Sequence, residues 1–164
     1  MIRRATIFGG VLLFAAGGFF TPDQASADGS AIVQISAVLA SREGRRGIDP
    51  RIEDLRPQLR GFPFRSYKLL NVQSCQFHQG DQCGMDIPGG GYLQMRTTES
   101  TPGHLKMRIL LIQDNRPILN ADVKLSRNAN LLLRSNRTER GTIIVSIKAP
   151  AQSAIENFEA MSKE

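Results

Sequence analysis

The two cysteines of the chain, Cys75 and Cys83, are the residues whose chemistry is most constrained by spacing. An even pair of cysteines in an exported protein favours a disulfide, because oxidising compartments keep sulfurs bridged. The segment between them, residues 77–81, fits a three-residue hairpin loop with Gly80 in the left-handed conformation. That centre places the two cysteines opposite each other. We therefore predict an intramolecular disulfide across a hairpin.

The same stretch also offers metal ligands. Cys75, His78, Asp81 and Cys83 lie close together in the sequence, and His104 could join them. Thiolate sulfur, imidazole nitrogen and carboxylate oxygen all bind zinc. The spacing matches no zinc finger or zinc ribbon, so the disulfide is the favoured interpretation and the metal site is the alternative. We predict no resident metal and no other cofactor.

Arginines are concentrated in one part of the chain. Residues 42–65 contain seven of them, and Arg134, Arg137 and Arg140 flank a polar turn further on. Guanidinium groups bind carboxylates and phosphates through paired hydrogen bonds. If these segments share a face, they form a platform for an anionic polymer; the alternative is an ordinary solvated face, because acidic residues are interspersed. The candidate anion-binding residues are Arg42, Arg45, Arg46, Arg51, Arg56 and Arg60.

No catalytic signature is evident in the sequence. A Cys–His nucleophile needs a free thiolate, and both cysteines are better explained as a bridge. The serines at 126, 135 and 146 stand in no nucleophile-elbow context. The glycines of residues 89–91 are not followed by the lysine and hydroxyl residue of a phosphate-binding loop. We predict no catalytic residue, and a hydrolase whose site is assembled from loops is the alternative.

The N-terminal stretch bears on the compartment. Residues 1–4 include two arginines, residues 5–20 form an apolar run, and Ala25-Ser26-Ala27 follows a polar break. Charged, apolar and small-residue regions in this order are typical of a secretory signal peptide. We predict a signal peptide over residues 1–27 and a periplasmic or secreted protein; a retained N-terminal anchor is the alternative. No second apolar run approaches the roughly 20 residues of a transmembrane helix.

The elements that must position these residues are mostly strands. Ala31 to Ala40 alternates apolar and polar side chains, as a half-buried strand does. The clearest antiparallel hairpin joins residues 105–111 to residues 119–125 across Asp114-Asn115. The other predicted strands are Tyr67–Phe77, Cys83–Ile87, Tyr92–Arg96, Leu131–Arg134 and Thr142–Lys148.

One helix is predicted, beginning at Asp49-Pro50. Asp49 can cap the free backbone N–H groups, and Pro50 fits the first turn, where its missing donor is not needed. Pro57 lies inside the helical pattern, so this helix is kinked or ends early. The apolar stripe consists of Ile52, Leu55 and Leu59. The expected fold class is α+β, mainly antiparallel β, with seven or eight strands in a sheet or sandwich and one N-terminal helix.

The domain organisation expected is a signal peptide over 1–27, a single β-rich domain over 28–149 and a polar C-terminal tail over 150–164. In the tail Ile155, Phe158 and Met161 are spaced by three, which permits a short amphipathic helix. A frayed end is the alternative, because an isolated helix of this length is marginal in water.

Several short motifs follow one another between residues 31 and 148. They are Val38 to Gly44, Gly47 to Ile52, Pro63 to Leu70, Ile87 to Gly90 and the terminal pair of strands. In this order they resemble a group of small, exported, uncharacterised β-rich proteins of Gram-negative, delta-proteobacterium-like bacteria. The resemblance implies architecture and compartment and assigns no activity or site. In that group the strand at 131–133 tends to end in a Gly-Gly step, where this chain has Arg134-Ser135-Asn136.

The function expected is that of an exported, non-enzymatic β-rich domain that binds another cell-envelope or extracellular component. An arginine-led binder of an anionic envelope polymer is the first alternative, and a small secreted hydrolase is the second. The formal net charge of +6 weakly favours an anionic partner. The partner is thus an envelope protein or an anionic polymer. Specific nucleic-acid recognition is not expected, because the chain has no Trp and no nucleic-acid-binding signature.

Overall fold

Strands make up most of the chain that the computed structural model describes, which is residues 31–78 and 80–151. The predicted signal peptide over 1–27 and the tail from residue 152 onward lie outside the described residues. The elements in chain order are β1 (Ala31–Ser41), β2 (Gly47–Ile48), the 3-10 helix η1 (Pro50–Leu55), α1 (Arg56–Leu59), β3 (Ser66–Phe77), β4 (Gln82–Ile87), β5 (Gly91–Ser100), β6 (His104–Gln113), β7 (Arg116–Ser126), β8 (Asn130–Thr138) and β9 (Gly141–Lys148).

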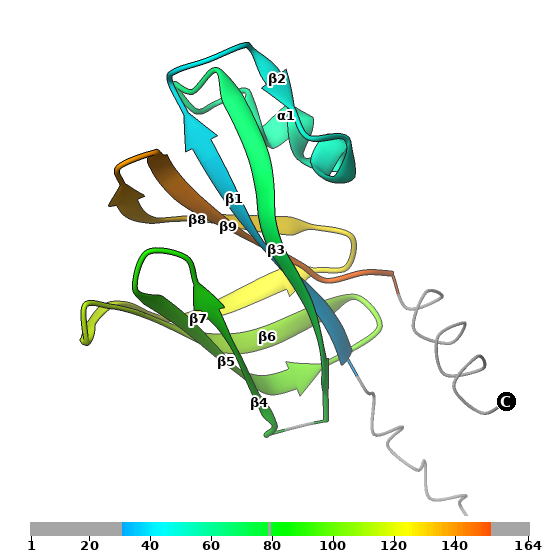
Figure 1. Ribbon diagram of the computed structural model, residues 1–164. Coiled ribbons are helices and arrows are strands. Elements are labelled where there is room, and N and C mark those ends of the chain that lie inside the picture. The colour runs from blue at the N-terminus through cyan, green and yellow to red at the C-terminus, as the bar shows by residue number, and fades with distance from the viewer. Residues whose placement is uncertain (1–30, 79, 152–164) are drawn as a thin grey trace, which may run out of the picture.

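These strands form two sheets (Figure 1). The five-stranded sheet has the order β2-β3-β1-β9-β8, and the four-stranded sheet has the order β4-β5-β6-β7. All pairs are antiparallel except the short parallel pair of β2 with β3. The prediction of a mainly antiparallel fold is therefore confirmed. A single sheet and a sandwich were both predicted, and the structure has the two packed sheets of a sandwich.

Two details of the predicted fold class are wrong. The described residues contain nine strands instead of seven or eight, because Gly47–Ile48 adds a strand too short to show any periodicity. The helical segment is not N-terminal, since β1 and β2 precede it. It is also split into η1 and α1: Ile52 leaves helical backbone angles, and Pro57 stands in the first turn of α1, where its ring and missing N–H are tolerated.

The main core lies between the two sheets. Val33 and Ile35 of β1 face Leu93 and Met95 of β5 within one cluster of buried side chains, and all four are fully buried. Their spacing of two along each strand puts them on the inner face of their sheet. Burial of a side chain of this size contributes about 1.5–3 kcal/mol relative to its exposure. This core is what holds the sheets together.

A second core lies on the outer face of the five-stranded sheet. The predicted stripe of Ile52, Leu55 and Leu59 is buried there against Val38 of β1 and Ile144 of β9. The helical segment thus covers that face, beside the upper ends of β1 and β3 (Figure 1). Because both of its faces are covered, β1 is buried continuously from residue 35 to residue 38, where the sequence predicts a half-buried strand.

Two anchors hold the helical segment in place. The Asp49 side chain accepts a hydrogen bond from Arg51 N at 3.1 Å, as a helix N-cap does, and another from Leu69 N of β3 at 3.2 Å. The buried Tyr67 hydroxyl donates to Leu59 O at 2.8 Å, at the other end of the segment. The predicted cap is therefore confirmed, and both ends of the segment are tied to β3.

Candidate functional site

Cys75 and Cys83 form a disulfide, as predicted, with their Cα atoms 6.2 Å apart. Gly80 has φ +89°, which confirms the left-handed residue predicted in the connecting turn. The predicted hairpin is wrong, however. Cys75 stands opposite Val33 in the five-stranded sheet and Cys83 opposite Met95 in the four-stranded sheet. The chain crosses from one sheet to the other between β3 and β4, so the disulfide ties the two sheets together. The hairpin prediction failed because alternation in the sequence identifies a strand but does not show which sheet the strand joins.

The bridge bears on the alternative metal site. Both cysteines are oxidised, so neither supplies the thiolate that a zinc site requires. His78 Nδ1 lies 3.2 Å from Asp81 Oδ2 on the exposed turn between β3 and β4. Within residues 31–78 and 80–151, no group of three or more His, Cys, Asp and Glu side chains is placed to hold a metal ion.

Two of the six candidate arginines are paired with acids of their own segment. Arg51 Nη2 donates to Asp49 Oδ2 at 2.8 Å, and Arg56 Nη2 donates to Glu53 Oε2 at 2.8 Å. The hydrogen bonds from Arg51 hold the pKa of Asp49 well below its usual range, and the same contact raises the pKa of Arg51. Hydrogen bonding to Arg56 likewise lowers the pKa of Glu53. For these two positions the structure supports the solvated-face interpretation.

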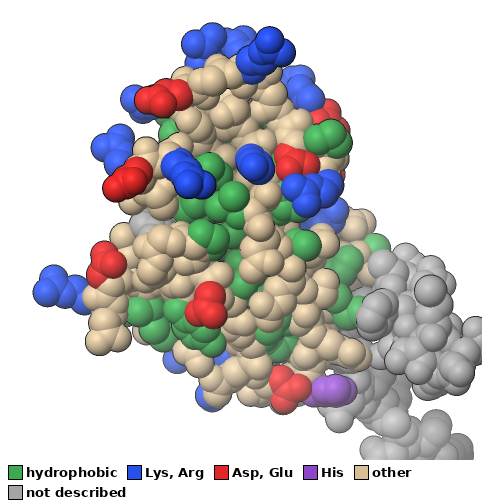
Figure 2. Space-filling view, in the orientation of Figure 1, with side chains coloured by type: hydrophobic (Ala, Val, Ile, Leu, Met, Phe, Trp, Pro, Cys, Tyr) green, Lys and Arg blue, Asp and Glu red, His purple; other side chains and the backbone are tan. Residues whose placement is uncertain are grey.

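The other four candidates are exposed, and none forms an ion pair with another residue in the described part of the chain. They are Arg42, Arg45, Arg46 and Arg60. Figure 2 shows lysine and arginine side chains around the upper end of the molecule, with acidic side chains between them. The arginine-rich region of the sequence is therefore one end of the fold, with mixed charge and a positive excess.

Arg42 is distinguished from the rest by what it touches. Its guanidinium carbon lies 5.9 Å from the centroid of the Phe64 ring, a cation–π contact worth about 0.5–1 kcal/mol at an exposed site. Both residues border a depression of about 250 Å³ between the end of β1 and the β8–β9 turn. Arg137 and Arg140 border the same depression from the turn.

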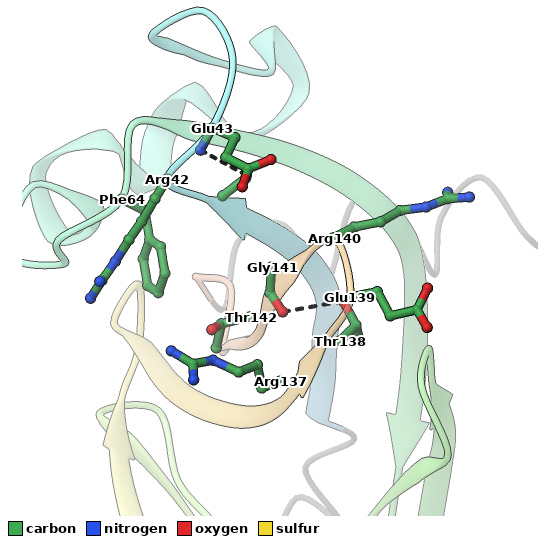
Figure 3. A pocket seen from close by; sticks show the side chains of 10 residues that line it. Arg42, Glu43, Phe64, Arg137, Thr138, Glu139, Arg140, Gly141 and Thr142 are labelled. Carbon is green, nitrogen blue, oxygen red and sulfur yellow. Dashed lines mark hydrogen bonds between the residues drawn. The ribbon is translucent and has the colours of Figure 1, made fainter.

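The side chains of the depression have distinct orientations (Figure 3). Arg137 reaches toward the side on which Arg42 lies along Phe64, whereas Glu139 and Arg140 extend from the opposite side of the turn. No ion pair joins Arg42, Arg137 or Arg140 to another described residue. Arg42 over the Phe64 ring and Arg137 on the same depression, neither of them ion-paired among the described residues, form a surface suited to a phosphate or a carboxylate.

The β8–β9 turn lies close to β1, with which β9 is paired, and two local features shape it. Thr138 Oγ1 donates to Gly141 O at 3.1 Å and closes the turn. Gly141 has φ +148°, and a Cβ at this position would lie 2.4 Å from Ala40 O of β1. The backbone can approach β1 this closely only because residue 141 is glycine. This approach brings the turn that carries Arg137 and Arg140 to the end of β1, so that both line the same depression as Arg42.

A separate cluster of titratable side chains lies at the β5–β6 turn. His104 Nε2 lies 3.0 Å from Glu99 Oε1, and His104 Nδ1 lies 2.9 Å from Thr101 Oγ1. A hydroxyl, an imidazole and a carboxylate in line are the components of nucleophilic hydrolases. Thr101 Oγ1 is also hydrogen-bonded to the backbone N and O of His104. Because the hydroxyl is committed to its own turn, the cluster is explained by turn closure.

No family model, curated protein or solved structure matches this chain. None of the helices among the described residues is long and apolar enough to cross a membrane. The resemblance to exported proteins of delta-proteobacterium-like bacteria stays a prediction. The functional argument therefore rests on the geometry of the arginine-bordered depression.

Sequence reasoning missed Phe64 and did not bring Arg137 and Arg140 into the candidate set. The signal that could have found the turn arginines is Gly141, a glycine at the start of a strand, which often marks a close backbone approach. Phe64 carries no such signal, since an aromatic residue that follows a helix is usually expected to pack in the core. The pairing of β9 with β1 brings the turn arginines to the depression that Arg42 borders, and the pairing of β3 with β1 brings Phe64 there.

Proposed function

We propose that this protein is an exported, non-enzymatic binding domain that holds an anionic component of the cell envelope at the depression bordered by Arg42 and Arg137. The observation that carries the proposal is that Arg42, which lies over the Phe64 ring, and Arg137, from a distant part of the chain, border the same depression. An arginine without a carboxylate partner keeps its five N–H donors for a ligand. Export is supported by the signal-peptide pattern and by a disulfide, which oxidising compartments permit.

The surrounding charge supports an anionic ligand. Residues 42–65 carry seven arginines against four acidic residues. Two of those arginines are neutralised by neighbours, and the others extend the positive field around the depression. Such a field raises the local concentration of an anion and its rate of association, and salt screens it over about 10 Å at 0.1 M.

The test is the binding of inorganic tripolyphosphate to the purified protein, followed by calorimetry and by amide chemical shifts. Replacement of both Arg42→Gln and Arg137→Gln is expected to weaken binding by roughly tenfold or more, because charge-assisted hydrogen bonds are lost. The amide shifts should centre on the β8–β9 turn. Affinity should also fall steeply as salt is raised.

Arg96→Gln is the matched control. Arg96 is exposed on β5, opposite Arg108 in the four-stranded sheet, and its replacement removes one positive charge away from the depression. Binding should be nearly unchanged in this variant. If Arg96→Gln weakened binding as much as the replacement of Arg42 and Arg137, net charge alone would explain the affinity. The absence of binding at low salt would also refute the proposed function.

A further inference from the structure

A second depression adjoins the arginine-bordered one and has the opposite character. It has a volume of about 320 Å³ and lies between the β8–β9 turn and the β4–β5 turn. Leu39, Leu70 and Ile143 supply its apolar lining. Because Ile143 is fully buried in the core between the sheets and Leu39 packs against that core, this depression, called the mouth below, lies directly over the edge of the core.

A β-bulge in β3 presents Leu70 to this mouth. Ala37 of β1 stands opposite Asn71 and Val38 stands opposite Leu69, so Leu70 has no partner across the pair. A bulge of this kind re-aims side chains relative to regular alternation. Leu69 packs on the outer face under the helical segment, while its neighbour Leu70, at the bulge, lines the mouth and remains 39% exposed.

The mouth and the arginine-bordered depression share the β8–β9 turn. Thr138, Glu139 and Arg140 line both of them. On one side of the turn Arg42 and Arg137 lie beside Phe64, and on the other side Leu39 and Leu70 lie above the core. An arginine-bordered depression, which Glu43 and Glu139 also line, and a depression with an apolar lining are thus separated by one turn.

We propose that the ligand is an anionic amphiphile with an acyl or alkyl chain, whose phosphate or carboxylate head group binds the arginines while its chain enters the mouth. This inference rests on the proposed function and names the ligand class for the same site. Charge complementarity selects the head group. The mouth, at the lower end of the 300–1,000 Å³ typical of small-molecule pockets, suits one chain better than a folded partner.

The orientation of the ligand follows from the charges at the rim, where two carboxylates, Glu43 and Glu139, accompany the arginines. Glu139 extends from the turn on the side opposite Arg137 (Figure 3), so the head group avoids that carboxylate by lying toward Arg42 and Arg137. The alkyl chain of the ligand then crosses the β8–β9 turn near Arg140, which lines both depressions. Its methylene groups would cover the exposed part of Leu70 and remove apolar surface from water.

The test compares ethyl phosphate, octyl phosphate and uncharged octyl glucoside, each below its micelle-forming concentration, by calorimetry on the purified protein. Octyl phosphate is expected to bind more tightly than ethyl phosphate, by up to about fourfold for each methylene that becomes buried. Leu70→Gln should weaken octyl phosphate binding about three- to eightfold, since the 39% of Leu70 left exposed no longer gains a chain contact. It should leave ethyl phosphate binding unchanged.

Val72→Gln is the matched control for Leu70→Gln. Val72 is 47% exposed on the same strand but lines a different depression, on the outer face with Ile52 and Leu69. Its replacement should not alter octyl phosphate binding. The comparison of ethyl phosphate with octyl phosphate, which differ in the length of the alkyl chain, needs no protein variant. The inference therefore stays testable even if Leu70→Gln fails to fold.

The outcomes separate the inference from the proposed function. Equal affinity for ethyl and octyl phosphate would overturn the amphiphile and leave the anion-binding function standing. Equal affinity for octyl phosphate and octyl glucoside would overturn both, because the charge would then contribute nothing. If vesicles containing anionic phospholipid bound the protein while monomeric octyl phosphate did not, the ligand would be a membrane surface and the inference would be wrong.

Discussion

Replacement of Gly141 by alanine should be among the most damaging small changes in this protein. Gly141 begins β9, has φ +148° and stands where a Cβ would lie 2.4 Å from Ala40 O and 3.1 Å from Ala40 C. The obstacle is backbone of β1, which is paired with β9 along its length and cannot move independently. An alanine therefore meets both an unfavourable backbone conformation and a steric clash.

The magnitude follows from these two contributions. An L-residue forced to positive φ costs about 1–2 kcal/mol. Displacement of well-packed structure by an added methyl group costs about 1–3 kcal/mol. The free energy of unfolding should therefore fall by about 2–5 kcal/mol, a large part of the 5–15 kcal/mol typical of a domain.

Two other glycines separate the contributions. Gly44 has φ +82° with nothing within 4 Å of its added Cβ, so Gly44→Ala should cost about 1–2 kcal/mol from backbone strain alone. Gly103 has open space and no positive φ, so Gly103→Ala should change stability by no more than about 0.5 kcal/mol.

Urea unfolding of the three variants measures these differences. The slope of the free energy of unfolding against urea concentration should be the same in all three variants, so that differences in the unfolding midpoint report differences in stability. A cost for Gly141→Ala no greater than that for Gly44→Ala would refute the close approach of the β8–β9 turn to β1. Because that approach brings the turn with Arg137 onto the same depression as Arg42, the same result would weaken the candidate site.

Three further predictions concern the rest of the fold. Replacement of both Cys75 and Cys83 by alanine should lower the free energy of unfolding by about 2.5 kcal/mol, since the bridge closes a short loop with a sequence separation of 8, while circular dichroism stays native-like; unchanged stability would show that the bridge does not restrain the unfolded chain. Tyr67→Phe should cost about 1–3 kcal/mol in urea unfolding because Leu59 O loses a buried donor, and a neutral result would mean that this carbonyl finds another partner. The hydrogen bonds to Asp49 lower its pKa in the folded state, so the stability that it contributes is fully present above its unfolded pKa of about 3.9 and is lost as the pH falls below that value. Asp49→Asn should flatten the loss of stability in acid, and parallel curves for the two proteins would contradict this.

Much of the secondary structure could be predicted because it depends on local pattern. The hairpin of β6 and β7 follows from alternation on both sides of Asp114-Asn115, and both turn residues have positive φ, as such a turn requires. The apolar stripe of the helical segment was predictable from its spacing of three and four residues. The disulfide partners were predictable because the chain has no other cysteines.

The sequence by itself determined which residues alternate, which turns are tight, which sulfurs pair and where arginine is abundant, because each of these depends on neighbours along the chain. Only the tertiary structure decided that Cys75 and Cys83 belong to different sheets, that Leu70 sits at a bulge, and that the β8–β9 turn packs against β1. Strands with similar alternation can pair in many orders, and the order is selected by burial of their faces over the whole domain. The meeting of Arg42 with Arg137 is a consequence of that order.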